Sequence, residues 1–389
     1  MRIGILLSRF PYPLEKGDKL RAFHQIRELS KTNQIFLCAI SDQKVDQKSI
    51  DQLKPYCEEI KIIRLSKPII LWNLLFGLFF SKLPLQVAYF YKKSARKELV
   101  NFFVNHKVDH IFCQLIRVSE YLKDLKSIPK TIDYMDVLSK GMERRIEKAS
   151  PLLKPLIRIE TKRLKKYEHF IFTAFQHQTI ISEQDRDLII HGNNHEIEII
   201  RNGVDQEFFS PRDVDKKYDL VFTGNMSYPP NVDGVSFLVE KILPVIWEDN
   251  PNIKLVIAGA NPNSRVQKLA QEKVIVTGWV DDIREYYASA RIFIAPMQIG
   301  TGLQNKLLEA MAMKIPCITS PLANNALKAT HEENILIAEH ISDYVVEIQR
   351  LLNDQSFANR IAQNGFDFVG DKYNWNSTTK QLENLFLKS

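Results

Sequence analysis

Residues 291–320, RIFIAPMQIGTGLQNKLLEAMAMKIPCITS, contain the pattern that decides the fold. The apolar run RIFIAPM meets a loop with two glycines, and a helical stretch predicted to start near Leu303 leads into a second apolar run. Strand, glycine loop, helix and strand in that order predict a βαβ unit with parallel strands. Lys306 and Glu309 lie three residues apart in the helical stretch, so we expect both side chains on one face.

This loop and helix have the chemistry of a nucleotide site. Free backbone amides at a helix start attract phosphate, and glycine lets a ligand approach closely. Lys306 can neutralise a diphosphate, and the Glu309 carboxylate can accept both hydroxyls of a ribose. The alternative interpretation, a glycine-capped core helix with a surface lysine, is at least as common for such a pattern taken alone.

The same βα alternation extends over the chain, which predicts an α/β protein with parallel sheets covered on both faces. At 389 residues, two domains are expected. A polar connection after Asn202-Gly203 separates the two series of strands, so we predict Rossmann-like domains over 1–205 and 206–370 that face each other across a cleft. Ligands in such sheets lie at the carboxyl ends of strands. The predicted strands are RIGILL, QIFLCAI, DHIFCQ, KTIDYM, QTIISE and EIEIIRN, then DLVFTGNM, IKLVIAGA, KVIVTGW, RIFIAPM and PCITSP.

Charge and cysteine content narrow the class of protein. The net charge is +7, but residues 1–205 hold 35 Lys and Arg against 24 Asp and Glu, whereas residues 206–389 hold 18 against 22. A basic half can meet nucleic acid, anionic lipid or a phosphorylated substrate. No nucleic-acid motif or dense basic block is present, so nucleic acid is not an expected partner. Four scattered cysteines without a CxxC pair favour a reducing compartment, and the N-terminal MRIGILLSRF suits a first strand better than a signal peptide. We therefore expect a cytoplasmic protein.

Residues 68–93, PIILWNLLFGLFFSKLPLQVAYFYKK, stand apart in composition. Their apolar core is about a dozen residues, short of the ~20 that a membrane-spanning helix needs. One interpretation is a buried helix followed by a loop. The other is an aromatic surface flanked by lysines that contacts an anionic membrane, at the inner face of the cytoplasmic membrane.

Six ordered motifs resemble glycosyltransferase family 4 and together cover essentially the whole chain. LLEAMAMKIPCITS resembles the family signature LEAMAxGxPVV, and IIRNGVDQEFF resembles the interdomain PNGVD hinge. PYPLEKGDKLRAFHQIREL resembles the pattern PPxKGDKIRxxHxxxxL of a bacterial exopolysaccharide subgroup. The other three are ISEQDRDLI, FTGNMSYPPNVDGVSFLVEKILP and VIVTGWVDDIREYYASARIFIAPM.

The resemblance implies a GT-B fold and a retaining enzyme. It would transfer a sugar from a nucleoside diphosphate sugar to an acceptor hydroxyl on a glycan or lipid-linked acceptor, in surface polysaccharide biosynthesis. No cofactor and no metal are implied, and the nine histidines show no ligand spacing. The DxD triplet at 213–215 is interpreted as solvated linker. In GT-B proteins the terminal helix, here within 371–389 and starting near Trp375, commonly crosses back to the N-terminal domain; packing on the C-terminal domain is the alternative.

The resemblance also implies a donor site with two departures. Glu309 matches the second glutamate of the family's E-x7-E motif, whereas Thr301 stands where the first would fall. The family's Arg…Lys pair is replaced by Gly224-Asn225 and Asn231-Val232-Asp233, so Lys306 is expected to take over phosphate neutralisation and act with Glu309 in catalysis. The expected donor-binding residues are Gly17, Lys19, Gly224, Asn225, Gly278, Gly300, Thr301, Gly302, Leu303, Gln304, Asn305, Lys306 and Glu309.

Acceptor binding is expected in the N-terminal domain. Asp18, Arg21, Asp133 and Asp136 are the candidates, the last two in the stretch where many family members carry a histidine. Asp136 either orients or deprotonates the acceptor hydroxyl, or caps the helix that follows. The alternative for residues 17–21 is a glycine turn before a helix with solvated basic side chains. Two other functions share this fold: a nucleotide-sugar epimerase, and a catalytically silent module that binds nucleotide or a partner.

Overall fold

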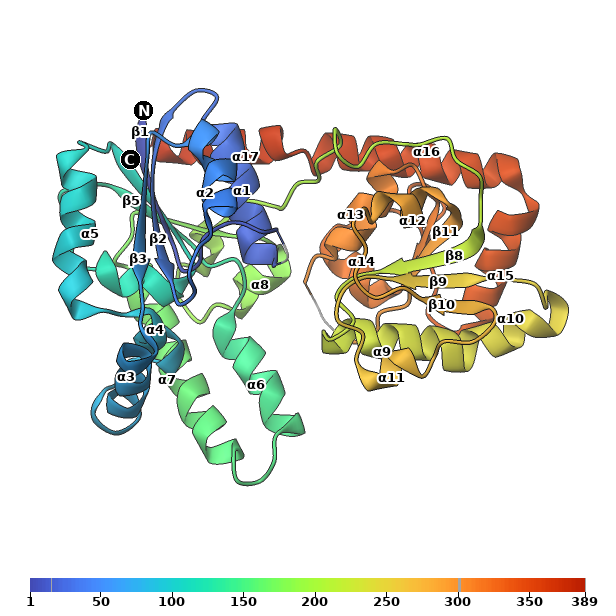
Figure 1. The fold of residues 1–389 in the computed structure, drawn as a ribbon, viewed down its shortest axis with the longest axis horizontal. Helices are drawn as coiled ribbons and strands as arrows, with labels where there is room; N and C mark the ends of the chain where they lie inside the picture. The colour runs from blue at the N-terminus through green and yellow to red at the C-terminus, as the bar shows by residue number, and fades with distance from the viewer. Residues whose placement is uncertain (15, 300–301, 389) are drawn as a thin grey trace. The chain divides into compact units, whose positions relative to one another are not determined.

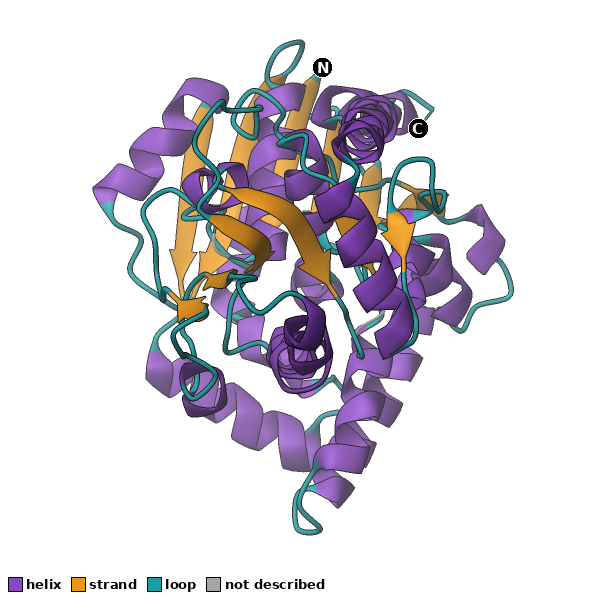
Figure 2. Ribbon diagram, turned by 90° about the vertical axis from the view of Figure 1, so that its right-hand side faces the viewer, coloured by secondary structure: helices purple, strands orange, loops and turns teal. Residues whose placement is uncertain are grey.

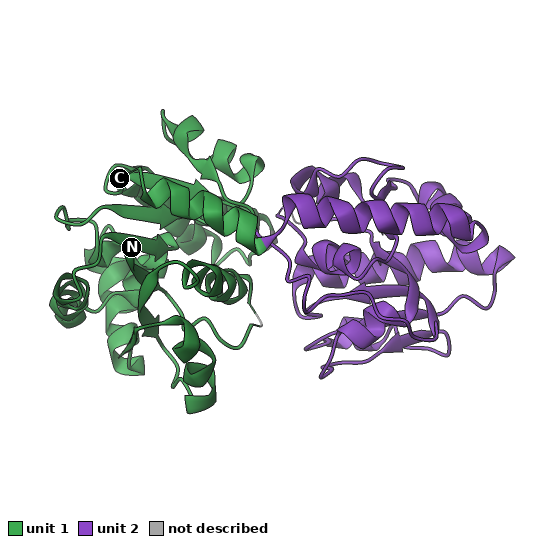
Figure 3. Ribbon diagram, turned by 90° about the horizontal axis from the view of Figure 1, so that it is seen from above, with its two compact units in different colours: residues 1–201, 375–389 green, residues 202–374 purple. Residues whose placement is uncertain are grey.

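The structure, a computed structural model, describes residues 1–14, 16–299 and 302–388 (Figure 1). The chain forms two compact units, which Figure 3 shows in different colours. Unit 1 contains Met1–Arg201 and Trp375–Ser389, and unit 2 contains Asn202–Asn374. The divisions at 201–202 and 374–375 lie four residues from the boundaries predicted at 205–206 and 370–371. The terminal helix, predicted to start near Trp375, belongs to unit 1.

Unit 1 is a parallel sheet with helices on both faces (Figure 2). Its strand order is β3-β2-β1-β4-β5-β6-β7, and each neighbouring pair is parallel. The central strands are almost continuously apolar and buried, as expected for a sheet covered on both sides. The strands are β1 Arg2–Leu7, β2 Gln34–Ser41, β3 Glu59–Arg64, β4 His110–Gln114, β5 Lys130–Asp133, β6 His177–Ile180 and β7 Glu198–Ile199. The α-helices are α1 Gly17–Leu29, α2 Gln47–Leu53, α3 Lys67–Phe80, α4 Leu85–Phe90, α5 Lys93–Asn105, α6 Leu138–Lys148, α7 Lys154–Phe172, α8 Glu183–Leu188 and α17 Trp375–Phe386.

Unit 2 repeats this plan with the parallel strand order β10-β9-β8-β11-β12-β13. The strands are β8 Tyr218–Thr223, β9 Leu255–Ala258, β10 Val274–Val276, β11 Ala290–Ala295, β12 Cys317–Thr319 and β13 Leu336–Ile337. The helices are α9 Pro229–Phe237, a π-helical turn Leu238–Ile242, α10 Leu243–Asp249, α11 Ser264–Gln267, α12 Arg284–Ala288, α13 Asn305–Ala312, α14 Pro321–Leu327, α15 Ile341–Asn353 and α16 Gln355–Lys372.

The predicted α/β class with two Rossmann-like sheets is confirmed, and each predicted strand is present. Two strands were missed. β3 lies in EIKIIR, which contains three charged residues and is only partly buried, and β13 is two residues long. The helix predicted to start near Leu303 starts at Asn305, after an extended residue at Gln304.

The terminal helix α17 completes a core of unit 1. Leu382 and Phe386 are buried in the apolar cluster built around β1 and α1. The Trp375 ring stacks on His24 with ring centroids 5.0 Å apart, and the Phe386 ring stacks on His110 at 4.5 Å. The C-terminal segment is therefore an integral part of unit 1.

Each sheet has one point at which the strand order changes direction. In unit 1 this point lies between β1 and β4, and in unit 2 it lies between β8 and β11. Loops that leave adjacent strands at such a point diverge to opposite faces and leave a crevice at the carboxyl edge. In unit 2 these are the loop after Thr223 and the loop from Pro296 to Gln304, which contains the quoted glycines.

Candidate functional site

Two glycines bring the carboxyl ends of β8 and β9 into close contact. Gly224 has φ +146°, and a Cβ there would lie 2.6 Å from the Asn231 amide nitrogen. Gly259 has φ +142°, and a Cβ there would lie 1.9 Å from the Gly224 carbonyl oxygen. Both the backbone conformation and the space therefore require glycine. Gly278, after β10, also has a positive φ of +72°, but its missing side chain faces open space.

Lys306, in the first turn of α13, lies at this edge of the sheet. Its Nζ donates to Asn231 Oδ1 at 2.5 Å and to Gln304 Oε1 at 3.1 Å, and it lies 5.1 Å from the centroid of the Phe222 ring. The residue is only 9% exposed. The two oxygen atoms that accept hydrogen bonds from Lys306 in the described part of the chain both belong to side-chain amides, which carry no charge.

The environment of Lys306 disfavours its charge. Burial lowers the pKa of Lys306 from 10.5 to about 7, and the nearby Glu309 carboxylate opposes this effect only in part. A bound anion would restore the charged form, because a buried cation gains most from a counter-ion that is also shielded from water. The buried ammonium group therefore has the electrostatic character of a group that favours an anionic partner.

Glu309 is held by a chain of hydroxyl groups from β8 and α12. The Tyr287 hydroxyl donates to Glu309 Oε2 at 2.8 Å, and it lies 2.6 Å from Thr223 Oγ1, which can donate to it in turn. Burial raises the pKa of Glu309, while the bond from Tyr287 and the charge of Lys306 lower it. Glu309 remains partly exposed, so its carboxylate can still accept hydroxyl groups of a ligand.

The other predicted donor residues surround these groups only in part. Gly302, Leu303, Gln304 and Asn305 form the approach to α13, and Asn305 accepts a bond from the Asn202 amide at 3.5 Å. Asn225 shapes the loop after β8, because its carbonyl accepts the Asn231 amide at 2.9 Å. The predictions for Gly300 and Thr301 lie outside the described residues.

Asn231, Tyr287 and Thr223 were not predicted as site residues. Asn231 lies in the motif FTGNMSYPPNVDGVSFLVEKILP. Nothing in the sequence shows that its side-chain amide contacts Lys306, 75 residues further on. Tyr287 lies in the short stretch REYYA, in which nothing distinguishes it from a tyrosine that merely packs in the core. Only the packing of α12 against α13 and β8 places its hydroxyl at Glu309.

In unit 1, two predicted acceptor residues form a buried ion pair instead. Arg21 Nε lies 2.7 Å from Asp133 Oδ2, and both side chains are 0% exposed. Asp133 also accepts a bond from the Thr179 hydroxyl at 3.0 Å. The prediction that Arg21 and Asp133 contact acceptor or phosphate is therefore wrong for this conformation: each neutralises the other in the interior, and the pair ties α1 to β5.

Asp136 keeps its candidacy at the carboxyl edge of β5. Its side chain is exposed, and the surrounding protein and the carboxylates of Asp185 and Asp18 raise its pKa to about 6 against the opposing charge of Arg117. The helix-cap alternative is wrong, because the cap residue of α6 is Val137 and no side chain caps that end.

The remaining predictions from the first βα unit lie at the start of α1. Gly17 is its first residue and faces open space, so no contact within the described residues requires glycine there. Lys19 Nζ donates to the Tyr12 carbonyl at 3.3 Å. Asp18 forms an ion pair with Arg9 at 2.6 Å, which places a mixed-charge surface beside Asp136 at the carboxyl edge.

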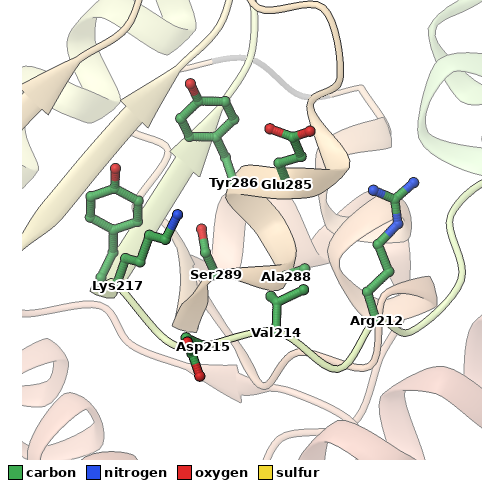
Figure 4. Close-up of a pocket in the computed structure, with 9 residues that line it drawn as sticks. Arg212, Val214, Asp215, Lys217, Glu285, Tyr286, Ala288 and Ser289 are labelled. Carbon is green, nitrogen blue, oxygen red and sulfur yellow. The ribbon is translucent and has the colours of Figure 1, made fainter.

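A pocket of about 600 Å³ lies at the opposite edge of the unit 2 sheet (Figure 4). It is lined by Tyr218, the first residue of β8, and by Ser289, which precedes β11, so it lies at the amino ends of the strands. Asp215 of the DxD triplet lines this pocket together with Arg212 and Lys217. The pocket is far from the glycines and Glu309 in the topology of the sheet, and we do not assign the donor to it.

His331, Glu332 and Glu347 form a group with the residue types and spacing of a metal site among the described residues. Arg350 already forms ion pairs with both of its carboxylates. His331 Nδ1 accepts the Ile337 backbone amide at 2.9 Å. The Arg350 cation thus already balances the charge of both carboxylates in this group.

Comparison with solved structures identifies the fold class. Over 100% of both chains, the structure superimposes on the Anabaena protein Alr3699/HepE in complex with UDP and glucose, with a TM-score of 0.69 at 14% identity. Sucrose-phosphate synthase from Thermosynechococcus elongatus gives a TM-score of 0.70 at 14% identity, over 100% of this chain and 99% of the other. Two parallel Rossmann-like sheets with this topology define the GT-B fold.

Sequence comparison identifies the type of enzyme. Residues 217–354 match the family described as "Glycosyl transferases group 1", which covers most of unit 2. A Klebsiella pneumoniae protein described as an uncharacterized 44.6 kDa protein in the cps region is 24% identical over 96% of both chains. The chain is a glycosyltransferase of the GT-B fold that carries a group 1 domain in unit 2.

Proposed function

We propose that this enzyme transfers a sugar from a nucleoside diphosphate sugar to a hydroxyl of a glycan or lipid-linked acceptor, with retention of anomeric configuration, in surface polysaccharide biosynthesis. The observation that carries the proposal is the pair formed by Lys306 and Glu309 at the carboxyl edge of the group 1 domain. Lys306 offers a buried ammonium group that has no carboxylate hydrogen-bond partner among the described residues. Glu309 offers a carboxylate that is oriented by the Tyr287 hydroxyl. These two groups complement a diphosphate and a ribose, respectively.

The relatives support the same assignment. The solved HepE structure holds UDP and glucose, the two halves of a nucleotide sugar. CapM of Staphylococcus aureus, described as a capsular polysaccharide biosynthesis glycosyltransferase, is 25% identical over 39% of this chain and 42% of its own length. Together with the cps-region relative, this similarity supports the proposal of a capsule-like glycan as acceptor.

In the proposed reaction, the acceptor hydroxyl oxygen forms a bond to the anomeric carbon as the bond to the diphosphate oxygen breaks. Lys306 stabilises the charge that grows on the departing diphosphate. Glu309 fixes the ribose, and the open space beside Gly278 leaves room for the donor. In one route the acceptor proton passes to the leaving phosphate and Asp136 only orients the hydroxyl. In the other route Asp136 accepts the proton. Neither route requires a metal or a cofactor.

The proposal is tested with a panel of UDP-, GDP- and TDP-sugars, by following nucleotide release with and without glycan or lipid-linked acceptors. We expect release of nucleoside diphosphate that depends on acceptor and persists in EDTA, and proton NMR of the product should show the anomeric configuration of the donor. Sugar isomerisation without acceptor would identify an epimerase instead. No turnover with any donor, together with nucleotide binding, would identify a silent module.

A further inference from the structure

Helix α3 of unit 1 exposes a continuous apolar face. Six of its large side chains are between 49% and 77% exposed to solvent: Leu71, Trp72, Leu75, Phe76, Phe79 and Phe80. They follow two rows with a spacing of four residues, so they share one side of the helix. Scattered single apolar residues are normal on a protein surface, but a contiguous patch of this kind marks an interaction site.

The opposite face of α3 is firmly held, so the patch is not the result of a loosely attached helix. At Gly77 a Cβ would lie 3.3 Å from the Ala88 Cβ of α4, which shows how closely the two helices pack. Arg163 of α7 donates to the Gly77 carbonyl at 2.7 Å and thereby caps the end of α3. One turn earlier in α7, the buried Glu160 accepts the Leu85 amide at 2.7 Å at the start of α4. Helix α7 thus fixes the α3–α4 pair with the apolar face directed outward.

A second apolar point lies at the turn that precedes α7. Leu152 is 88% exposed and Leu153 is 51% exposed. Figure 1 shows this turn and α3 at the same end of unit 1. Arg163, which contacts α3, lies ten residues after Leu153, roughly 15 Å along α7 at 1.5 Å per residue. The helix and the turn together offer two apolar contacts on one side of the unit.

The segments that carry these two apolar contacts have a net positive charge. Residues 60–97, which include α3 and α4, hold eight Lys and Arg and no Asp or Glu. Residues 138–172, which form α6, α7 and their turn, hold ten Lys and Arg against four Asp and Glu. A second copy of the chain is a poor partner, because symmetric pairing would bring these basic segments against each other. An anionic lipid surface complements both the charge and the apolar side chains.

We propose that α3 and the α6–α7 turn dock unit 1 on an anionic bilayer. In the described residues no helix combines the length and the hydrophobicity needed to cross a membrane, so the contact would be peripheral, with α3 lying in the headgroup plane. Helices α3 and α6 both follow strands at the carboxyl edge of the sheet, the edge that carries Asp136. Resting on the function proposed above, this arrangement favours an acceptor whose lipid anchor lies in the same bilayer.

Vesicle co-sedimentation of the full chain tests the docking without reference to activity. The probes are phosphatidylglycerol–phosphatidylcholine vesicles and pure phosphatidylcholine vesicles. We expect binding to the anionic vesicles that weakens with salt but leaves a residual apolar component. The W72S/F76S variant should bind roughly tenfold more weakly and lose that residual component. The K67Q/K82Q variant should lose roughly fivefold per lysine at low salt. The matched control is Trp279→Ser, which removes an equally exposed tryptophan from unit 2 and should leave vesicle binding unchanged.

Fluorescence and light scattering distinguish the remaining outcomes. Brominated lipids should quench the wild-type fluorescence, and the quenching should decrease in Trp72→Phe. Equal recovery in the supernatant with and without anionic vesicles would overturn the docking proposal. So would self-association at micromolar concentration that W72S/F76S abolishes, because it would identify a second copy as the occupant of the patch. Acceptor-dependent turnover in detergent without vesicle binding would leave the proposed function intact and remove only the docking.

Discussion

Replacing Lys306 with methionine should stabilise unit 2 at neutral pH while it abolishes transfer. Burial lowers the pKa of Lys306 from 10.5 to about 7, which corresponds to roughly 5 kcal/mol of disfavoured charging in the folded state. Methionine has a similar length and no charge, so it removes that cost. It also leaves the buried Asn231 amide oxygen without this donor, which costs about 1–3 kcal/mol. The net expectation is a gain of about 2–4 kcal/mol in the free energy of unfolding near pH 6.5.

The sign of the pH dependence follows from linkage. A lysine whose folded pKa is depressed destabilises the fold fully below the folded pKa, near 7, and the destabilisation is lost as pH rises toward 10.5. The advantage of Lys306→Met should therefore shrink by roughly 3 kcal/mol between pH 6.5 and 9.5. Calorimetric or urea unfolding at both pH values, with separate transitions fitted for the two units, provides the measurement.

The matched control is Lys241→Met, because it makes the same substitution at an exposed lysine of the same unit. Turnover, followed by nucleotide release, should fall more than donor binding, because the diphosphate charge grows as the glycosidic bond breaks. Equal stability changes at pH 6.5 and 9.5 would refute the buried charge. Full activity of the Lys306→Met variant would show that another group binds the phosphate.

Three further changes test other parts of the site. Glu309→Gln should raise donor KM or lower kcat with the circular dichroism unchanged, because each charge-assisted bond to ribose is worth about 1.5–3 kcal/mol; unaltered donor kinetics would favour a core-helix role. Tyr287→Phe removes the hydroxyl that orients Glu309, so kcat/KM should fall about fivefold, and it should not fall further in the Glu309→Gln background if the hydroxyl acts only through that carboxylate. Arg21→Met should destabilise unit 1 by about 3–5 kcal/mol, whereas adding Asp133→Leu should recover much of that loss; a selective rise in acceptor KM with unchanged stability would restore the acceptor role.

The sequence was sufficient for the fold because the strands are continuous apolar runs separated by helical periodicity. It also placed Lys306 and Glu309 together, because they lie three residues apart in one helix, and their role in donor binding stays a prediction. It could not supply Asn231 and Tyr287, whose hydrogen bonds to α13 join segments distant in sequence. It also misassigned Arg21. The residue type alone does not show whether an arginine faces solvent or pairs with a buried carboxylate such as Asp133.

Because α17 belongs to unit 1 but follows unit 2 in the sequence, the two units cannot finish folding in the order in which they begin to be synthesised. The sheet of unit 1 is complete once residue 199 has been made, but Leu382 and Phe386, which fill its core beside β1 and α1, are synthesised more than 180 residues later. Unit 2, an uninterrupted segment from Asn202 to Asn374, contains all of its own core. A nascent chain should thus carry an unsealed first domain on the ribosome while the second one folds ahead of it. Termination after residue 377 would leave unit 2 whole and the core of unit 1 without Leu382 and Phe386.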